Sequence, residues 1–335
     1  MRRSTLRRRP RDRRSLHRRG SRPGRAGRRS AAVQPVAPGR AGGWSCRRGA
    51  AYARDLTVPG SALSAALAAA ARHGLPCDDA RVLRDVTNLL VHLRPAPVVA
   101  RVPITLARLR SRDWFLQEVE LASFLSEGGA PVAPPAGGLD PGPHEQDGFL
   151  VSFWAYVDDD PRRFESAAAG RSLRALHEAL TGYPGSLPSC DRLAEVRQLL
   201  SELEPSDLLP ASDLAALRHL AAGMTSVSGG RPLHGDSHLR NILWSPQGPL
   251  WTDLENACTG PVEYDLACLS WRGAPGTDRA LAAYGDFDGG TLDRMAPHLA
   301  LFLAAWTVIL VERVPSAGGR AEARRRVRRA LEHAP

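Results

Sequence analysis

Five polar residues that could carry out chemistry lie close together in the stretch PLHGDSHLRNILWSPQGPLWTDLENACTGPVEYDLA, residues 232–267. His234, Asp236, His238 and Asn241 fall within eight residues, and Asp253 follows Asn241 by twelve. Short apolar runs separate these polar groups. A buried ionisable group is costly unless it is paired or bound to something. The spacing therefore indicates a site that binds a ligand.

Two short apolar segments predict how these groups are brought together. The segments ILW and PLWT, joined by the turn residues SPQG, predict a β-hairpin that places Asn241 beside Asp253. Two oxygen ligands of this kind suit Mg²⁺ when phosphates complete its coordination shell. Asp236 would then lie beside the metal without binding it, where it could orient and deprotonate a hydroxyl, as the catalytic Asp of kinases does.

The two-part motif carries a family resemblance. HGDSHLRN, followed by WTDLENACTGPVEYDLA, resembles the aminoglycoside phosphotransferase family, the protein-kinase-like enzymes with an HGDxHxxN catalytic loop. The resemblance extends over about residues 55–315. It implies an α+β, protein-kinase-like two-lobe fold, with a small N-terminal antiparallel sheet and one helix, and a larger, mainly helical C-terminal lobe. It also implies a small-molecule kinase that transfers the γ-phosphate of ATP or GTP to a hydroxyl group.

The resemblance assigns roles in the catalytic loop. Asp236 is the expected catalytic base, and Asn241 and Asp253 are the expected Mg²⁺ ligands. Three further residues are expected to pack the loop or tie it by hydrogen bonds: His234, His238 and Asp265.

The first lobe is expected to hold the nucleotide. Arg101, in VVARV, stands where a kinase has its phosphate-binding Lys, and Glu118 is its expected helix partner. The planar fork of Arg binds phosphate differently from the point charge of Lys, so this position departs from protein kinases. The segment FWAYV resembles the hinge between the lobes, where Phe153 and Ala155 would meet the nucleobase. RDVTNLL occupies the place of a Gly-rich loop.

Plainer interpretations exist for these residues. Asp and Asn often serve as turn and capping residues, Arg101 could be a solvated strand end, and Glu118 could be a surface charge. Asp and Asn residues at kinase-loop spacing favour the catalytic interpretation. Glu255 could be a second neighbour of the metal or part of a strand end, and the second interpretation is preferred.

Two other functions are compatible with parts of the pattern. A metal-dependent hydrolase would use His234, Asp236 and His238 as Zn²⁺ ligands, but this leaves Asn241 and Asp253 without a role. A non-catalytic, nucleotide-binding pseudokinase would not need the complete set of catalytic and metal-binding residues.

Periodicity predicts the elements around the site. The segment PGSALSAALAAAARHGLP predicts a helix, and RDVTNLLVHL and APVVARVPI predict neighbouring strands. SRDWFLQEVELASFLSE predicts a helix that ends at Gly128-Gly129, and FLVSFWAYV predicts another strand. Helices follow. We expect a nucleotide-binding lobe over residues 51–152 and a catalytic and substrate lobe over residues 153–335.

The basic charge of the chain is concentrated at its start. The net charge of the 335 residues is +10, but residues 1–50 hold 17 Arg and one Asp. The remaining residues carry 28 Arg and 34 acidic residues, so they are mildly acidic. We expect residues 1–50 to be a disordered Arg-rich head, either from a mis-assigned start or as an inert tail. Without interleaved aromatic residues or a nucleic-acid module, it is not expected to bind nucleic acid.

The composition of the chain predicts the compartment in which the protein is located. The cysteines form no CxxC pair and indicate a reduced, cytoplasmic compartment. The longest apolar run, residues 299–311, is shorter than a bilayer span and predicts a buried helix.

The acidic C-terminal half bears on the acceptor. Residues 153–310 hold 20 acidic residues and 12 Arg, and include the trio at residues 158–160. This balance favours a small cationic acceptor, although a solvated surface explains the same count. The acceptor's identity, the choice between ATP and GTP, and the oligomeric state stay open.

Overall fold

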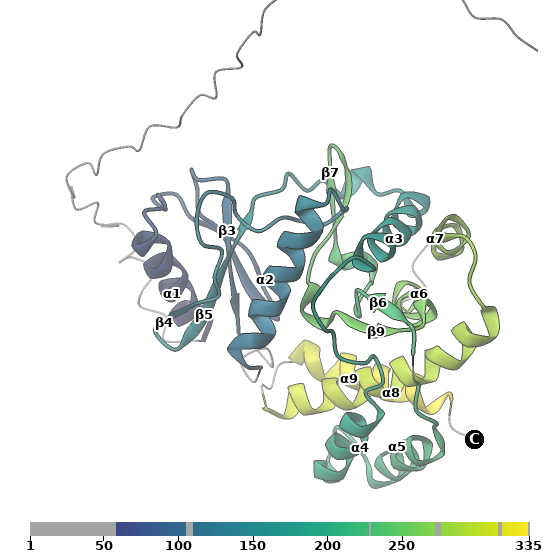
Figure 1. Ribbon diagram of the computed structural model, residues 1–335. Coiled ribbons are helices and arrows are strands. Elements are labelled where there is room, and N and C mark those ends of the chain that lie inside the picture. The colour runs from purple at the N-terminus through teal and green to yellow at the C-terminus, as the bar shows by residue number, and fades with distance from the viewer. Residues whose placement is uncertain (1–57, 105–109, 228, 272–275, 314–316, 334–335) are drawn as a thin grey trace, which may run out of the picture. The chain divides into compact units, whose positions relative to one another are not determined.

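The computed structural model describes residues 58–104, 110–227, 229–271, 276–313 and 317–333 (Figure 1). The Arg-rich head expected over residues 1–50 lies outside the described residues. Within them, a sheet with two helices precedes a mainly helical part.

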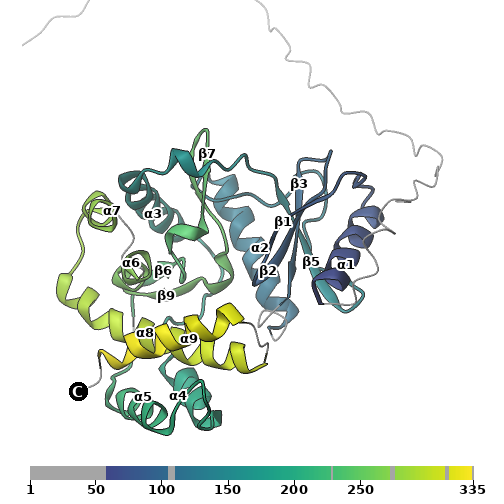
Figure 2. The same ribbon diagram turned by 180° about the vertical axis from the view of Figure 1, so that it is seen from behind.

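The sheet is antiparallel, with the strand order β1-β2-β3-β5-β4. Its strands are β1 (Arg81–Asp85), β2 (Asn88–His92), β3 (Val98–Pro103), β4 (His144–Gln146) and β5 (Phe149–Ala155). Helix α1 (Val58–Arg72) packs on one face, and α2 (Arg112–Glu127) lies on the other (Figure 1 and Figure 2). Because both faces are covered, β3 is buried along almost its whole length, which explains its continuous apolar sequence.

The first hairpin differs in detail from the sequence prediction. The run RDVTNLLVHL, expected as one strand, divides between the end of β1 and the whole of β2. The turn lies at residues 86 and 87, where the side chain of Val86 is 60% exposed. Leu83, in β1, lines a cleft beside this turn. The hairpin tip therefore covers a cleft instead of packing in the core.

Helix α2 connects the sheet to the helical part. Its buried residues lie on one face at helical spacing, and the chain leaves the helix at Gly128, as expected from the Gly-Gly pair. Leu121, Ala122 and Leu125 pack in a cluster that includes Trp251 and Leu173 of the helical part. One face of α2 thus belongs to the second hydrophobic core.

The helical part contains seven α-helices within the described residues. These are α3 (Ser166–Leu180), α4 (Leu193–Glu202), α5 (Ala211–Gly223), α6 (Val262–Ser270), α7 (Thr277–Tyr284), α8 (Gly289–Arg313) and α9 (Ala317–Leu331). Two short β-pairs lie among them: β6 (Arg231–Leu233) with β9 (Cys258–Gly260), and β7 (Ile242–Ser245) with β8 (Gly248–Trp251). The three-residue helices Pro161–Arg163, Leu239–Asn241 and Leu254–Asn256 complete the elements.

Helix α8 is long and apolar enough to cross a membrane by length and composition. An 18-residue stretch within Gly289–Glu312 has a mean hydropathy of 1.7, and 56% of that stretch is buried inside the protein. The helix packs against α4, α6 and α9. A core helix meets the same criterion, and a buried helix is what the sequence predicts for residues 299–311.

The fold prediction is confirmed. A small antiparallel sheet with α1 and α2 precedes the mainly helical part, and the β7–β8 hairpin forms where the sequence predicts it. Strand β5 continues to Ala155, across the lobe boundary expected at residues 152 and 153.

Candidate active site

A single buried carboxylate holds the catalytic loop. Asp265, on α6, accepts the backbone N–H groups of His234 (2.8 Å) and Gly235 (2.9 Å). Its Oδ2 also contacts Nε2 of His177 at 2.8 Å, and its backbone oxygen accepts the hydroxyl of Ser237 at 2.7 Å. Burial alone would raise the pKa of Asp265, but these hydrogen bonds and the neighbouring histidines lower it. The ionised carboxylate of Asp265 therefore holds the backbone of the loop in place.

His234 joins the loop to the neighbouring hairpin. Its Nδ1 accepts the backbone N–H of Asp236 (3.2 Å), so its Nε2 donates to the backbone oxygen of Thr252 (3.0 Å). The side chain is fully buried, and burial lowers its pKa, which keeps it neutral. Both ring nitrogens are engaged, so His234 has no free lone pair for a zinc ion. This geometry argues against the hydrolase interpretation.

Gly235 allows two loops to meet. Its φ is +81°, and a Cβ atom placed on it would lie 1.8 Å from the backbone oxygen of Asn256. A side chain there would collide with backbone atoms that cannot move aside. The loop that carries Asp236 and the segment that carries Asp253 therefore touch at this glycine.

Asp236 lies at the centre of the site and keeps 29% of its side chain exposed. The amide nitrogen of Asn241 donates to its backbone oxygen at 2.9 Å and approaches its Oδ2 at 3.3 Å. Nε2 of His238 is 3.7 Å from the same Oδ2. Burial, and next the charge of Asp253, raise the pKa of Asp236 to about 7. A carboxylate with this pKa is suited to accept a proton near neutral pH.

The hairpin brings Asn241 and Asp253 to the same place. Ile242 pairs with Trp251 across the two strands, and the backbone N–H of Thr252 donates to the oxygen of Asn241 at 2.8 Å. Asn241 and Asp253 therefore flank the open end of the hairpin. The amide nitrogen of Asn241 is used by Asp236, which leaves its side-chain oxygen for a cation.

Arg101 is the centre of a buried charge cluster. Its Nη1 pairs with Glu118, and its Nη2 lies 2.7 Å from Asp253 and 2.6 Å from Glu255. Arg101 and Glu118 are almost completely buried, with 8% and 2% of their side chains exposed. Burial, together with the negative charges of the other acids, raises the pKa of Glu118 and that of Glu255. Three carboxylates thus surround one guanidinium, which leaves an excess of negative charge.

This excess fits a divalent cation. Asp253 and Asn241 line the same cleft as Arg101 and present the oxygen atoms that Mg²⁺ prefers. Among the described residues, no group of three or more His, Cys, Asp or Glu side chains is arranged to hold a metal. A magnesium site agrees with that observation, because a few protein oxygens suffice when phosphate oxygens complete the coordination shell. A zinc centre with three protein ligands does not agree with it.

The cleft beside this cluster has a volume of about 450 Å³. Ala155, at the end of β5, and the two residues after it, Tyr156 and Val157, line this cleft, as Asn241 and Asp253 do. Phe153 does not: its side chain is fully buried, its N–H donates to Pro141, and its oxygen accepts the N–H of Ala136. The chain therefore reaches the cleft after Phe153, at residues 154–157.

Two features of the site differ in detail from the sequence analysis. Glu255 lies in the short helix Leu254–Asn256 and contacts Arg101, so the preferred strand-end interpretation is wrong; its position two residues after Asp253 is the signal for the other interpretation. Within the predicted hinge segment FWAYV, Tyr156 and Val157 line the cleft and Phe153 does not, a distinction that strand periodicity alone does not make.

The acidic trio at residues 158–160 has partners of its own. Oδ1 of Asp159 accepts the backbone N–H of Trp244 at 2.7 Å, and Asp160 binds both the backbone and the side chain of Arg162. Asp158 pairs with Arg163 at 3.5 Å. These acids follow the end of β5, and Asp159 lines the cleft beside Asn241 and Arg101. They give no support to a cationic acceptor site.

Comparisons with known structures agree on the fold. The GDP complex of wild-type aminoglycoside 2'-phosphotransferase-IIIa is 15% identical, with a TM-score of 0.59, over 81% of this chain and 98% of that one. A choline/ethanolamine kinase family protein from Mesorhizobium loti is 21% identical, with a TM-score of 0.55, over 76% and 88%. Amicoumacin kinase hAmiN, in complex with AMP-PNP, Ca²⁺ and Ami, is 15% identical, with a TM-score of 0.57, over 77% and 89%. At these identities the likeness concerns the fold alone.

The sequence itself matches one family. A search of curated proteins gives no match. The profile of the phosphotransferase enzyme family matches residues 81–298, which is more than half of the chain and includes both parts of the catalytic motif. The chain therefore belongs to the phosphotransferase enzyme family, and it is an enzyme that transfers phosphate to an alcohol group of a small molecule.

Proposed function

We propose that the protein is a cytoplasmic small-molecule kinase that uses Mg²⁺ and transfers the γ-phosphate of ATP or GTP to a hydroxyl group. One observation carries this proposal. The cluster of Arg101 and its three carboxylates lies in the same cleft as Asn241, whose amide contacts Asp236. A phosphate-binding group, a cation site and a base thus meet at one point. The related folds bound to GDP or to AMP-PNP support a nucleotide donor.

The predicted site residues would have separate roles in binding the metal and the nucleotide. Asn241 and Asp253 would hold Mg²⁺, which neutralises the phosphate charge when it is bound. Arg101, oriented by Glu118, would bind phosphate oxygens with the N–H groups that it now shares with Asp253 and Glu255. Ala155 lines the cleft and, with the residues that follow it in FWAYV, would meet the nucleobase. On this proposal, residues 51–152 bind the nucleotide and residues 153–335 bind the acceptor.

Asp236 would act on the acceptor hydroxyl. Its carboxylate is held by Asn241 and by the loop that Asp265 anchors, so it can accept the hydroxyl proton without first reorganising. Most of the rate enhancement in phosphoryl transfer comes from positioning and charge neutralisation. His234 and His238 would maintain the shape of this loop.

The complete residue set argues against a pseudokinase. Asp236, Asn241 and Asp253 are all present and adjacent, whereas loss of catalysis would leave at least one of them without a function. Phosphotransfer by the same protein that is used to test the nucleotide site would distinguish an active kinase from a pseudokinase.

Thermal unfolding of the full chain with Mg²⁺ and either ATP or GTP tests the nucleotide site. A ligand at about 100 times its dissociation constant should stabilise the fold by about 2.7 kcal/mol. We expect the shift to require Mg²⁺ and to be lost in Asp253→Ala. A shift with Zn²⁺ alone, and none with either nucleotide, would overturn the proposal.

A further inference from the structure

A second buried arginine, Arg192, lies outside the nucleotide cleft. It precedes α4, and only 8% of its side chain is exposed. Its guanidinium reaches two acceptors, both at long range: Oδ1 of Asn256 at 3.4 Å and Oε2 of Glu195 at 3.7 Å. Its Nε is buried and has no hydrogen-bond partner in the described part of the chain. A guanidinium has five N–H donors, and leaving them unsatisfied in the interior is costly.

Arg192 is linked to the catalytic loop through Asn256. Asn256, which it contacts, closes the short helix that follows Asp253. The backbone oxygen of Asn256 abuts Gly235, the residue before Asp236. Arg192 does not line the nucleotide cleft. The acceptor hydroxyl has to lie within hydrogen-bond distance of Asp236. The rest of the acceptor molecule therefore needs room beside the catalytic loop, outside the nucleotide cleft.

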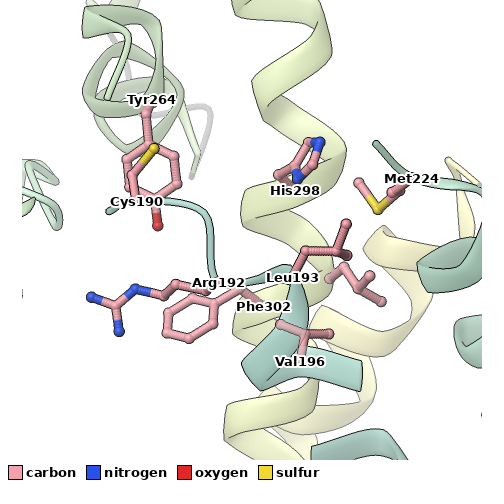
Figure 3. Close-up of a pocket in the computed structure, with 9 residues that line it drawn as sticks. Cys190, Arg192, Leu193, Val196, Met224, Tyr264, His298 and Phe302 are labelled. Carbon is pink, nitrogen blue, oxygen red and sulfur yellow. The ribbon is translucent and has the colours of Figure 1, made fainter. Parts of the chain in front are cut away.

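Aromatic residues of α8 place the guanidinium. The Cζ atom of Arg192 lies 4.8 Å from the centre of the Phe302 ring. Figure 3 shows the guanidinium extending past this ring, away from His298 and Met224. A small cavity on the other side, of about 10 Å³, is too small for a substrate, so it is not the binding site itself. The charged end of Arg192 points out of that cavity.

One turn further along α8, a second donor is unsatisfied. The ring of Trp306 lies 6.0 Å from that of Phe302, and its buried Nε1 has no acceptor among the described residues. The guanidinium of Arg110 stacks over Trp306 at 5.0 Å and over Trp114, on α2, at 4.1 Å. Two cations and an indole N–H thus follow one stripe of α8.

The charges along this stripe repel each other. Burial, and next the positive charge of Arg192, lower the pKa of Arg110, and the negative charges of Glu195 and Glu255 offset this only in part. A third arginine, Arg326 on α9, donates to the hydroxyl of Thr307 at 2.8 Å, beside Trp306. Its pair with Glu322 at 2.8 Å neutralises it in part. An anion between Arg110 and Arg192 would relieve the repulsion and satisfy the open donors, whereas a cation would increase the repulsion.

We propose that Arg192, Arg110 and the indole of Trp306 form an oxyanion subsite beside the catalytic loop, and that the acceptor is an alcohol carrying a carboxylate or a phosphate group. This inference rests on the proposed function, because it assigns the acceptor of that reaction. Guanidinium groups bind both oxyanions through paired, charge-assisted hydrogen bonds. The acceptor class therefore differs from the cationic one that the acidic composition favours.

Anion binding can be measured without knowing the acceptor. The full-length protein, saturated with Mg²⁺ and a non-hydrolysable nucleotide, is titrated with sulfate or acetate at constant ionic strength, and the tryptophan fluorescence is followed. We expect saturable binding that is weakened about tenfold or more in Arg192→Gln and in Arg110→Gln. Arg171→Gln, on the exposed face of α3, should bind as the unchanged protein does. Sulfate and acetate distinguish a phosphate-like from a carboxylate-like preference.

An acceptor panel separates this inference from the proposed function. Glucuronate, glucose 6-phosphate, glucose and glucosamine share one ring and differ in charge. We expect phosphotransfer, or competition with sulfate, to favour the two anionic members. Equal binding of sulfate in Arg192→Gln, or a preference for glucosamine, would overturn the subsite while leaving the kinase intact. Arg192-dependent sulfate binding in a protein that binds no nucleotide would overturn the proposed function while leaving the subsite intact.

Discussion

Arg101 and Arg192 are equally buried, each with 8% of its side chain exposed, but their surroundings are opposite. Arg101 has three carboxylates at short distance, whereas Arg192 has one carboxylate at 3.7 Å and an unpartnered Nε. The first environment has an excess of negative charge and suits a cation. The second has an excess of donors and suits an anion. One short segment links the two arginines, because Asp253 pairs with Arg101 and Asn256 contacts Arg192.

The largest effect is expected at Asp236 itself. Asp236→Asn keeps the side-chain shape but removes the proton acceptor, so we expect kcat to fall about 10²- to 10⁴-fold. Nucleotide binding and sulfate binding should both persist. Steady-state kinetics and the two titrations measure this, with the exposed Asp278→Asn on α7 as control. Turnover close to that of the unchanged protein would remove Asp236 from the chemistry.

Replacing each arginine by methionine tests the contrast directly. Arg101→Met leaves Glu118 buried without its partner, and we expect a loss of about 3–5 kcal/mol in the free energy of unfolding. Arg192→Met breaks no short hydrogen bond, so we expect a change of less than about 1 kcal/mol. Urea unfolding of the ligand-free proteins measures both. Equal losses would show that Arg192 is as well paired as Arg101.

The pH dependence of the reaction reports on Asp236. Its pKa is raised to about 7, and the base must be deprotonated to act. We expect kcat/KM for the acceptor to rise with pH through this range at low Mg²⁺. Saturating Mg²⁺ and nucleotide should move the rise to lower pH, because a nearby cation favours the carboxylate. A profile that ignores the metal concentration would place the titrating group elsewhere.

A small gain in stability is expected at Glu255. Burial and the charge of Asp253 raise its pKa to about 7. A raised pKa means that the charged form costs stability above that pH, and that the cost disappears as the pH falls. Glu255→Gln should therefore stabilise the ligand-free protein by about 1 kcal/mol at pH 8 and have almost no effect near pH 5. Differential scanning calorimetry at the two values measures this, and a gain only at pH 5 would contradict it.

Local spacing explains why the catalytic loop was predictable. Asp236, Asn241 and Asp253 lie on one loop and one hairpin, so their proximity follows from turn chemistry and strand pairing. The two helices of the first part were predictable in the same way, because their apolar residues recur at helical spacing and end at glycine.

Long-range contacts explain what the sequence could not predict. Asn256 meets Arg192 across 64 positions, and Arg101 meets Glu255 across 154. Neither pairing leaves a periodic signal in the sequence. The shift of the cleft from Phe153 to Tyr156 depends on how Pro141 and Ala136 use the backbone of β5. Such features are decided by tertiary packing, which propensity and periodicity do not encode.

The anchoring of the catalytic loop by Asp265 has a consequence for the evolution of substrate choice. Asp265 holds the backbone of the loop from α6, whereas Arg110, Arg192 and Trp306 come from three other segments. Substitutions along α8 or before α4 can therefore alter the charge that an acceptor would contact without moving the base.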